Sequence, residues 1–185
     1  YFNIKASYKL DSLALKKAQI SYFLNTGNPY YIDSIKTKIN TPVLDSLYKR
    51  TKSQLIPGKQ YKTEDFENEK NHITTYFRNH GAYRFQSNYI NFDIDTINKK
   101  DKATVTLNIE NYSYLENDSI KTEPFKLYKI SDIKVYTDYS TANHNQPIKD
   151  SVTHNNMTLY GFKKIKYTPH AITDAIFITK GDLFN

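Results

Sequence analysis

The sequence of 185 residues contains no cysteine, no tryptophan and only one methionine. Without cysteine the chain can form no disulfide, carry out no thiol chemistry and build no thiolate zinc site. Arginine is also scarce, because Arg50, Arg78 and Arg84 are the only arginines among 26 basic residues. Arginine is favoured for bidentate phosphate and guanine contacts. A net charge of +7 carried mainly by scattered lysines therefore gives little support to nucleic-acid binding.

Motifs for catalysis and metal binding are missing as well. The five glycines are isolated, so there is no glycine-rich phosphate loop, and no Ser/His/Asp or Cys/His order stands out. Asp93 and Asp95 share a strand face, but they precede a turn in which aspartate is common. Five histidines show no paired-ligand spacing: His72, His80, His144, His154 and His170. We therefore expect no enzymatic activity, no metal and no cofactor.

Long apolar runs are absent too. No run of about 18 apolar residues occurs, and no charged-then-apolar segment opens at Tyr1. This stretch therefore predicts neither a membrane-spanning helix nor a targeting signal of its own. What the chain does have is 17 tyrosines and 10 phenylalanines. Aromatic residues at this frequency favour sheet surfaces over a helical bundle.

Residues 30–111 contain one complete β-α-α-β-β unit, and residues 31–39 are its first strand. Thr41-Pro42 predicts that a helix follows over residues 41–55, because threonine can cap free amides and proline at the first helical position loses no hydrogen bond. A second helix begins at Thr63, after a Pro-Gly break, with acidic residues in its first turn. Its apolar stripe, which we expect to be buried, consists of Phe66, Ile73, Tyr76 and Phe77.

The second helix is expected to end at Gly81, after which the apolar pattern has a period of two. This alternation predicts a second strand over residues 83–94. Its phase changes between Phe85 and Ile90, which indicates a bulge or a strong twist. The chain then turns through residues 98–102 into a third strand that alternates cleanly.

Parts of this unit recur on either side of it. The hairpin of residues 1–28 matches the closing hairpin of the complete unit, with Ala18 aligned to Ala103 at an offset of 103 − 18 = 85. Residues 32–36 match residues 130–134, at an offset of 130 − 32 = 98. Residues 41–61 are similar to residues 168–184. Each segment begins with Thr-Pro, a signal for a helix start, and ends with a glycine followed three residues later by an aromatic residue. Similarity at fixed spacing is the signature of a repeat.

The repeat divides the chain into four expected segments. Residues 1–28 are the C-terminal hairpin of a first unit, residues 29–113 the complete unit, residues 114–127 a polar linker, and residues 128–185 the N-terminal part of a third unit. That third part carries an insertion at residues 138–161, rich in Asn, Thr and His. Because an isolated hairpin and a half-built sheet cannot bury their apolar faces, we expect the native chain to continue in both directions.

Three motifs make the chain resemble POTRA domains, the periplasmic modules of the Omp85 superfamily of outer-membrane assembly proteins. They are Tyr-x-Ile-x-x-Ile at the start of each copy, Ile-Pro-Gly-Lys-Gln-Tyr at residues 56–61, and Tyr-Phe-Arg-Asn-His-Gly-Ala-Tyr at residues 76–83. Residues 89–96 resemble the TamA-like branch more than BamA itself. The insertion at residues 138–161 departs from the minimal module.

The resemblance implies an α+β fold of tandem β-α-α-β-β modules, each with two helices on a three-stranded mixed sheet. It also implies a non-enzymatic role in protein assembly or translocation, in the periplasm, with attachment to the outer membrane through other parts of the protein. The partners it implies are unfolded outer-membrane protein clients, periplasmic or lipoprotein subunits, and the protein's own C-terminal membrane β-barrel. Nucleic acid is not among them.

The resemblance places the client- or partner-binding edge on the second strand. An edge strand offers free amides and carbonyls to an incoming extended segment, and such pairing tolerates many sequences. The residues assigned to this edge are Tyr83, Arg84, Phe85, Gln86, Ser87, Asn88 and Tyr89. The alternative is an edge that is merely protected by its bulge and by Arg84.

A second candidate site is the basic tip before the last strand, formed by Lys99, Lys100 and Lys102. It could meet anionic lipid headgroups or an acidic partner, although a solvated hairpin tip is the plainer interpretation. A different function also stays open, that of a basic α+β nucleic-acid-binding protein. It would need a clustered basic face with exposed aromatic residues, and the scarcity of arginine favours the POTRA interpretation.

Overall fold

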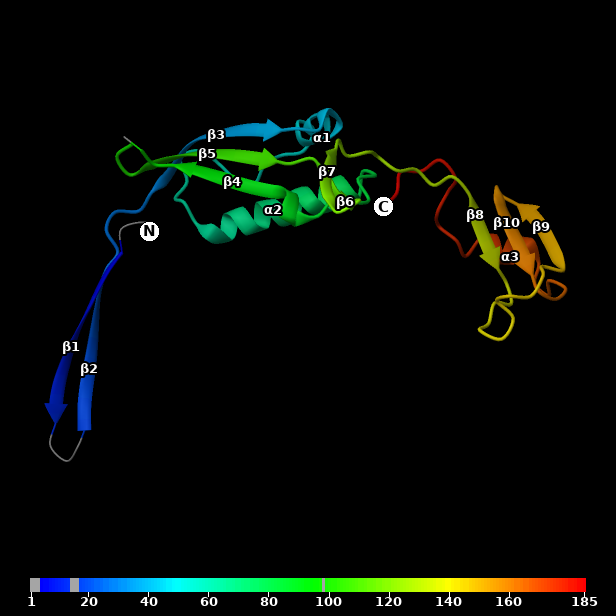
Figure 1. Ribbon diagram of the computed structural model, residues 1–185, viewed down its shortest axis with the longest axis horizontal. Helices are drawn as coiled ribbons and strands as arrows, with labels where there is room; N and C mark the ends of the chain where they lie inside the picture. Colours follow the sequence, from blue (N-terminus) through cyan, green and yellow to red (C-terminus); the bar gives the residue numbers. More distant parts are fainter. Residues whose placement is uncertain (1–3, 14–16, 98) are drawn as a thin grey trace. The chain divides into compact units, whose positions relative to one another are not determined.

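The computed structural model describes residues 4–13, 17–97 and 99–185, and the chain divides into two compact units. Unit 1 comprises Tyr1–Tyr76 with Arg84–Phe125, and unit 2 comprises Phe77–Tyr83 with Lys126–Asn185. Figure 1 shows the order of their elements. Within the described ranges no helix is long and apolar enough to cross a membrane, and no three His, Cys, Asp or Glu residues gather that could hold a metal ion.

Unit 1 is built around a three-stranded mixed sheet with the order β3-β5-β4. The central strand β5 (Lys102–Ile109) runs parallel to β3 (Tyr31–Ile39) and antiparallel to β4 (Ile90–Asp95). Helices α1 (Pro42–Tyr48) and α2 (Thr63–Arg78) come between β3 and β4 in the chain, and α2 runs along the sheet (Figure 1). The predicted α+β class and the β-α-α-β-β order of the complete unit are therefore confirmed.

Helix α1 is shorter than predicted, since it ends at Tyr48 rather than near residue 55. The Thr41 side chain does not cap it. Instead, the Thr41 hydroxyl donates to Asn111 Oδ1 at 2.9 Å and accepts the Phe125 amide at 3.1 Å. Thr41 thus ties the start of α1 to residues far along the chain, and a local capping signal cannot reveal that use.

Helix α2 begins at Thr63 as predicted and is held on the sheet by Phe66. The Phe66 ring centroid lies 4.7 Å from that of Tyr61 and 5.0 Å from that of Phe92, the latter edge-on. The buried cluster around it consists of Ile32, Leu55, Phe66 and Val105. Of the predicted stripe, Phe66, Ile73 and Phe77 are buried and Tyr76 is half-buried.

A buried acidic side chain joins α2 to the loop after α1. Glu69 is 1% exposed, and its carboxyl oxygens accept the Ser53 hydroxyl and the Gln54 amide, both at 2.7 Å. The Tyr48 hydroxyl donates to the same carboxyl group at 3.4 Å. Burial raises the pKa of Tyr48, so this hydroxyl keeps its proton beyond its ordinary range. The group is thus a polar bridge across unit 1.

Residues 114–127, predicted to be a linker, contain most of a hairpin instead. It pairs β6 (Tyr112–Glu116) with β7 (Ser119–Glu123). Asn117 and Asp118 form its two-residue turn with φ of 48° and 58°, the left-handed backbone that such turns require. The prediction was wrong because the strands are short and polar, although their turn residues mark the hairpin in the sequence.

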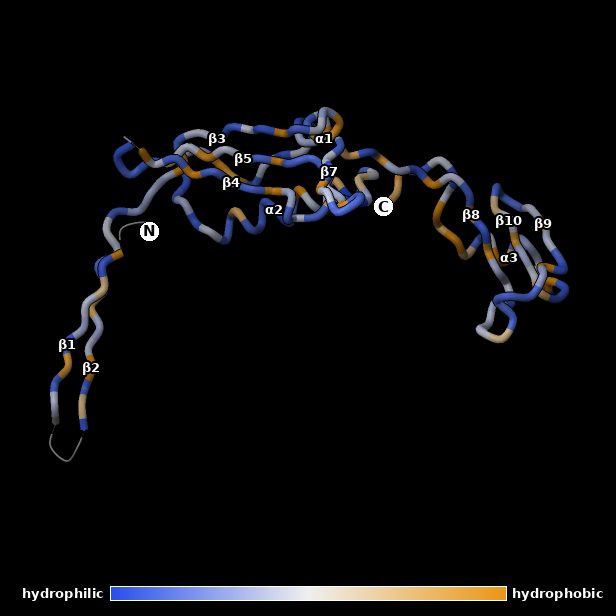
Figure 2. Tube along the Cα trace, viewed as in Figure 1, coloured by the Kyte–Doolittle hydropathy of each residue, from blue (hydrophilic) through white to orange (hydrophobic). Residues whose placement is uncertain are grey.

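The N-terminal hairpin pairs β1 (Lys5–Leu13) with β2 (Lys17–Asn25). Its strands begin 85 residues before β4 and β5, since 90 − 5 and 102 − 17 give the same offset. Leu10 of β1 and Ile20 of β2 are hydrophobic positions between hydrophilic neighbours (Figure 2), and they lie opposite each other. These two side chains are exposed, whereas β5 is almost wholly buried. The hairpin therefore repeats the spacing of the closing hairpin of unit 1.

Unit 2 has its own three-stranded sheet, with the order β8-β10-β9. The central strand β10 (Met157–Gly161) runs parallel to β8 (Ile133–Tyr136) and antiparallel to β9 (Asp150–His154), as in unit 1. Residues 138–161, predicted as an insertion into the module, thus supply two of the three strands. Helix α3 (Pro169–Thr173) follows at the Thr-Pro start that the repeat predicts.

The two units share a feature that we call the backbone clip. In it, a segment that contains a glycine forms two backbone hydrogen bonds with a residue at the start of the first strand or just before it. In unit 1 the Gly58 amide donates to the Ile32 carbonyl at 2.7 Å, and the Ile32 amide donates to the carbonyl of the residue after Gly58 at 2.9 Å. In unit 2 the Gly181 amide donates to the Ile130 carbonyl at 2.8 Å, and the Ile130 amide donates to the Asp182 carbonyl at 2.9 Å. Both glycines have positive φ, of 85° and 95°. The repeat between residues 41–61 and 168–184 is thus present in the hydrogen bonding.

Candidate functional site

The segment assigned to the binding edge, residues 83–89, is not a strand. Its residues Ser87–Tyr89 form a 3-10 turn, η1, in which the Tyr89 amide donates to the Gln86 carbonyl at 3.2 Å. Strand β4 begins only at Ile90. The change of phase in the sequence therefore reflects a helical turn rather than a bulge, and the prediction that residues 83–89 form an edge strand was wrong.

Aromatic contacts explain why this segment alternates like a strand. Phe85 is fully buried, and its ring centroid lies 5.1 Å from that of Phe125. The Tyr89 ring meets the same Phe125 ring edge-on at 5.0 Å. The Arg84 guanidinium lies over the Tyr112 ring, 5.1 Å from its centroid. These contacts bind the segment to the base of the β6–β7 hairpin, so their role is structural.

Tyr83, the first residue assigned to the edge, belongs to unit 2. Its ring centroid lies 4.6 Å from that of Phe184 and 6.0 Å from that of Tyr128. The neighbouring Gly81 carbonyl accepts the Tyr128 amide at 2.8 Å, and Gly81 itself has the positive φ, 93°, expected of a helix stop. Tyr83 is therefore a packing residue of unit 2 and not part of a sheet edge.

The open edge of the unit 1 sheet is β4 itself, which pairs with β5 alone in the part of the chain that the structure describes. The Glu110 amide donates to the Tyr89 carbonyl at 3.1 Å, which identifies this pair as the hydrogen-bonded type. Since the two pair types alternate in an antiparallel ladder, the backbone groups of Ile90, Phe92 and Ile94 point away from β5. The Ile90 amide already donates to the Ser87 carbonyl of η1, so the outward groups are the amides of Phe92 and Ile94 and the carbonyls of all three residues.

The opposite edge, β3, is less open. The clip covers its start through the bonds at Ile32 and an antiparallel bridge between Tyr31 and Gln60. Beyond the clip, β3 presents the exposed residues Lys36 and Lys38, and lysine on an edge discourages pairing with another strand. Strand β4 contains neither lysine nor proline. Of the two edges, β4 is the better suited to accept an extended segment.

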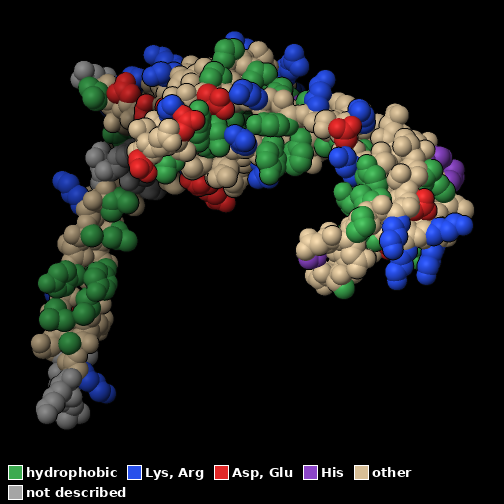
Figure 3. Space-filling view, turned by 45° about the vertical axis from the view of Figure 1, so that its right-hand side comes forward, with side chains coloured by type: hydrophobic (Ala, Val, Ile, Leu, Met, Phe, Trp, Pro, Cys, Tyr) green, Lys and Arg blue, Asp and Glu red, His purple; other side chains and the backbone are tan. Residues whose placement is uncertain are grey.

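Two of the three exposed residues of β4, Asn91, Asp93 and Asp95, are acidic. Asp93 accepts Asn108 Nδ2 at 2.7 Å. Asp95 accepts the Ile97 amide at 3.0 Å and forms an ion pair with Lys99 at 3.4 Å. The Ile97 amide, and after it Lys99, hold the pKa of Asp95 below its usual range, so this side chain is charged at neutral pH. Figure 3 shows acidic and basic side chains interspersed over unit 1.

A polar hollow of about 410 Å³ lies at the end of the sheet where β4 begins. Asn88 and Tyr89 of the assigned segment line it, together with residues that the sequence did not identify. These are Asn40, Glu110, Asn111, Ser113 and Thr122. They come from the ends of β3 and β5 and from the β6–β7 hairpin, so only the fold brings them together. Amide and hydroxyl side chains of this kind can bind the backbone of an extended segment.

The basic tip does not concentrate positive charge. Lys99 is paired with the end of β4, and Lys102 Nζ lies 3.3 Å from Asp33 Oδ1. Lys100 lines a hollow of about 470 Å³ together with Asp33 and Asp101. Since each of these lysines lies near a carboxylate, the solvated-tip interpretation is favoured over binding of an anionic partner.

Comparisons with known proteins find likeness in structure but not in sequence. No protein-family model matches the chain, and no curated protein matches it. The solved structures that match include the crystal structure of Haemophilus influenzae BamA POTRA3-5, with a TM-score of 0.41 and 11% sequence identity. The alignment covers 100% of this chain and 57% of that chain, so the chain spans little more than half the length of the structure that it matches.

Proposed function

We propose that the chain is a POTRA region of an Omp85-type outer-membrane assembly or translocation factor, located in the periplasm. Support comes from the β-α-α-β-β order of unit 1, from its β3-β5-β4 sheet and from the clip that recurs in unit 2. The TamA-like character rests on residues 89–96 alone. The alternative of nucleic-acid binding gains nothing from unit 1, where the lysines of the tip lie near carboxylates.

The proposed domain arrangement follows the repeat. Residues 1–28 are the closing hairpin of one module, and the matching offset between the β1–β2 and β4–β5 hairpins supports this assignment. Residues 29–113 are a complete module, to which the β6–β7 hairpin adds residues up to Phe125. Residues 126–185 belong to a further module, and the second clip supports this assignment.

In this proposal unit 1 binds clients or partner subunits by adding a strand to β4. The observation that carries the proposal is the single pairing of β4, with outward backbone groups at every second residue from Ile90 to Ile94. Backbone pairing tolerates many sequences, which suits unfolded outer-membrane proteins. Their strands are segments of about ten residues with alternating apolar and polar side chains.

Replacing Ile94 with proline should weaken the binding of an extended segment about tenfold. Proline removes one outward amide, and its ring interferes with the adjoining pair. The probe is a synthetic peptide of alternating apolar and polar residues, titrated against the 185-residue chain by fluorescence anisotropy. Ile94→Ala is the matched control, because it removes the same side chain and keeps the amide. We expect the alanine variant to bind within about twofold of the unchanged chain.

The two variants also separate lost binding from lost folding. NMR amide signals of α2 and β5 show whether each variant keeps the fold of unit 1. If both variants are folded and lose affinity equally, side-chain packing rather than the outward amide supports binding. Strand addition at β4 would then be wrong.

A further inference from the structure

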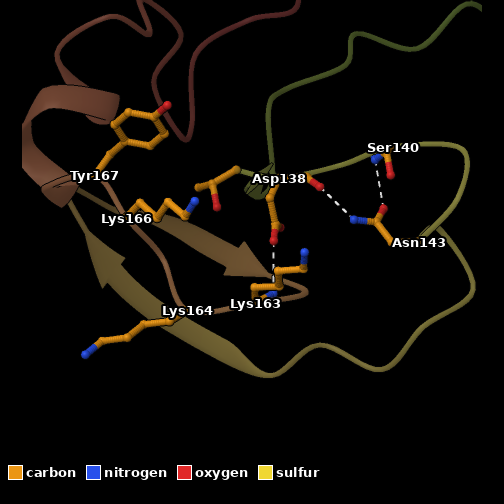
Figure 4. A pocket seen from close by; sticks show the side chains of 8 residues that line it. Asp138, Ser140, Asn143, Lys163, Lys164, Lys166 and Tyr167 are labelled. Carbon is orange, nitrogen blue, oxygen red and sulfur yellow. Dashed lines mark hydrogen bonds between the residues drawn. The ribbon is translucent and has the colours of Figure 1, made fainter.

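Unit 2 contains a basic hollow that strand addition to β4 does not use. Its volume is about 350 Å³, and it lies between the segment after β8 and the segment after β10. Figure 4 shows it from close by. The residues that line it are Thr137, Asp138, Ser140, Asn143, Lys163, Lys164, Lys166 and Tyr167. The lining holds three lysines and one carboxylate, whereas two of the three lysines at the basic tip of unit 1 are paired with carboxylates.

Hydrogen bonds that Asp138 accepts hold together the segment after β8 and the segment after β10. The Asp138 carboxylate accepts the backbone amides of Phe162 and Lys163, each at 2.9 Å and each on a different oxygen. Asn143 Nδ2 donates to the Asp138 carbonyl at 2.7 Å, and Asn143 Oδ1 accepts the Ser140 amide at 2.8 Å. The backbone at Lys163 is therefore held against residues 138–143 by hydrogen bonds.

The hollow carries an excess of positive charge. The ion pairs among the described residues involve other lysines than the three that line it. Asp138 is the single acidic residue of the lining, and its oxygens already accept two amides. Lys163 and Lys166 extend toward the Asp138 end of the hollow, whereas Lys164 points away (Figure 4). Two ammonium groups against one carboxylate leave one net positive charge at that end.

We propose that this hollow binds a phosphate group, carried either by an anionic phospholipid headgroup or by a free phosphate compound. Lysine binds phosphate as a point charge, and Ser140, which also lines the hollow, carries a hydroxyl that can donate to an anion. Tyr167 is 64% exposed beside the lysines, and tyrosine is common where protein meets a membrane surface.

The test titrates the full chain with two probes. Sodium phosphate binding is followed by the NMR amide shifts of Ser140 and Tyr167, and binding to phosphatidylglycerol vesicles is followed by sedimentation, with phosphatidylcholine vesicles as reference. Replacing Lys163 and Lys166 together with glutamine should weaken binding about 25-fold, since each lysine near an anionic group contributes about fivefold. The matched control, Lys52→Gln with Lys59→Gln, makes the same charge change at exposed positions of unit 1.

Each outcome supports or overturns the site. Binding to anionic vesicles with little response to phosphate identifies a lipid headgroup, whereas saturable phosphate binding with no preference for anionic vesicles identifies a free phosphate compound. Both results support the proposal if the control variant binds within about twofold of the unchanged chain. An equal loss in the control variant, no binding of either probe, or binding of polyglutamate alone overturns it.

Discussion

Replacing Phe66 with alanine should lower the free energy of unfolding of unit 1 by about 3 to 5 kcal/mol. The ring is 5% exposed and packs between Tyr61 and Phe92, so its removal leaves a cavity at the contact between α2 and the sheet. Since a whole domain is stable by only about 5 to 15 kcal/mol, this variant should be close to unfolded at ambient temperature. A urea titration followed by the NMR amide signals of β5 measures the change.

Phe177 provides the matched control for this substitution. Its side chain is 94% exposed, so Phe177→Ala makes the same chemical change without opening a cavity. We expect it to change the unfolding free energy by less than about 0.5 kcal/mol. A Phe66→Ala variant that unfolds at the same urea concentration as the unchanged chain would show that α2 does not pack on the sheet through this ring.

Replacing Glu69 with alanine should cost unit 1 about 2 to 3 kcal/mol of stability. The Gln54 amide and the Ser53 hydroxyl lose their acceptor, and Tyr48 loses a partner, at the one carboxyl group of this set that is fully buried. Donors left without their acceptor account for most of this cost. The same urea titration measures it.

Two further variants show whether the loss comes from the buried acceptor. Glu69→Gln keeps a carbonyl oxygen for the Gln54 amide, so its loss should be less than half that of the alanine variant. Glu67→Ala removes an exposed carboxylate from the same helix and should stay within about 0.5 kcal/mol of the unchanged chain. Equal losses of stability for the alanine variants at positions 67 and 69 would mean that the loss comes from a change in helix propensity and not from the lost hydrogen bonds of Glu69.

The parts of the fold that local signals encode could be predicted from the sequence. Thr63 with its acidic first turn marks the start of α2, and Gly81 has the positive φ of a helix stop. The offset of 85 residues reproduces the starts of both hairpins. The helix signals depend on residues that are neighbours in the chain, and the offset is a direct comparison of two segments, so the sequence carries this information without the fold.

The candidate site was harder to predict because the apolar side chains of residues 83–89 alternate as in a strand, although they pack against two different units. Tyr83 and Phe85 alternate like strand residues, but they are spaced to meet Phe184 in unit 2 and Phe125 in unit 1, each distant in the sequence. The sequence therefore predicted an edge strand several residues too early. The edge itself lies on β4, within the predicted strand of residues 83–94 but not within the residues assigned to the site.

The hairpins β6–β7 and β9–β10 were not predicted from the sequence, for a different reason. Their turns, Asn117-Asp118 and Asn155-Asn156, have the positive φ of two-residue hairpin loops and can be recognised by residue type. The strands of the first hairpin are short, and Leu115 and Ile120 are both highly exposed. In the second hairpin β10 buries Met157 and Leu159, but its partner β9 is short and polar, so this segment resembled an insertion.

Hydrogen exchange at the amides of β4 distinguishes strand addition from any other mode of binding. With the alternating peptide bound, exchange should slow at Phe92 and Ile94, whose amides point outward, and stay unchanged at Asn91 and Asp93, whose amides already bond to β5. This alternate protection is the result that we expect. Saturating peptide that slows no β4 amide, slows all of them alike or protects β3 instead would contradict strand addition at this edge.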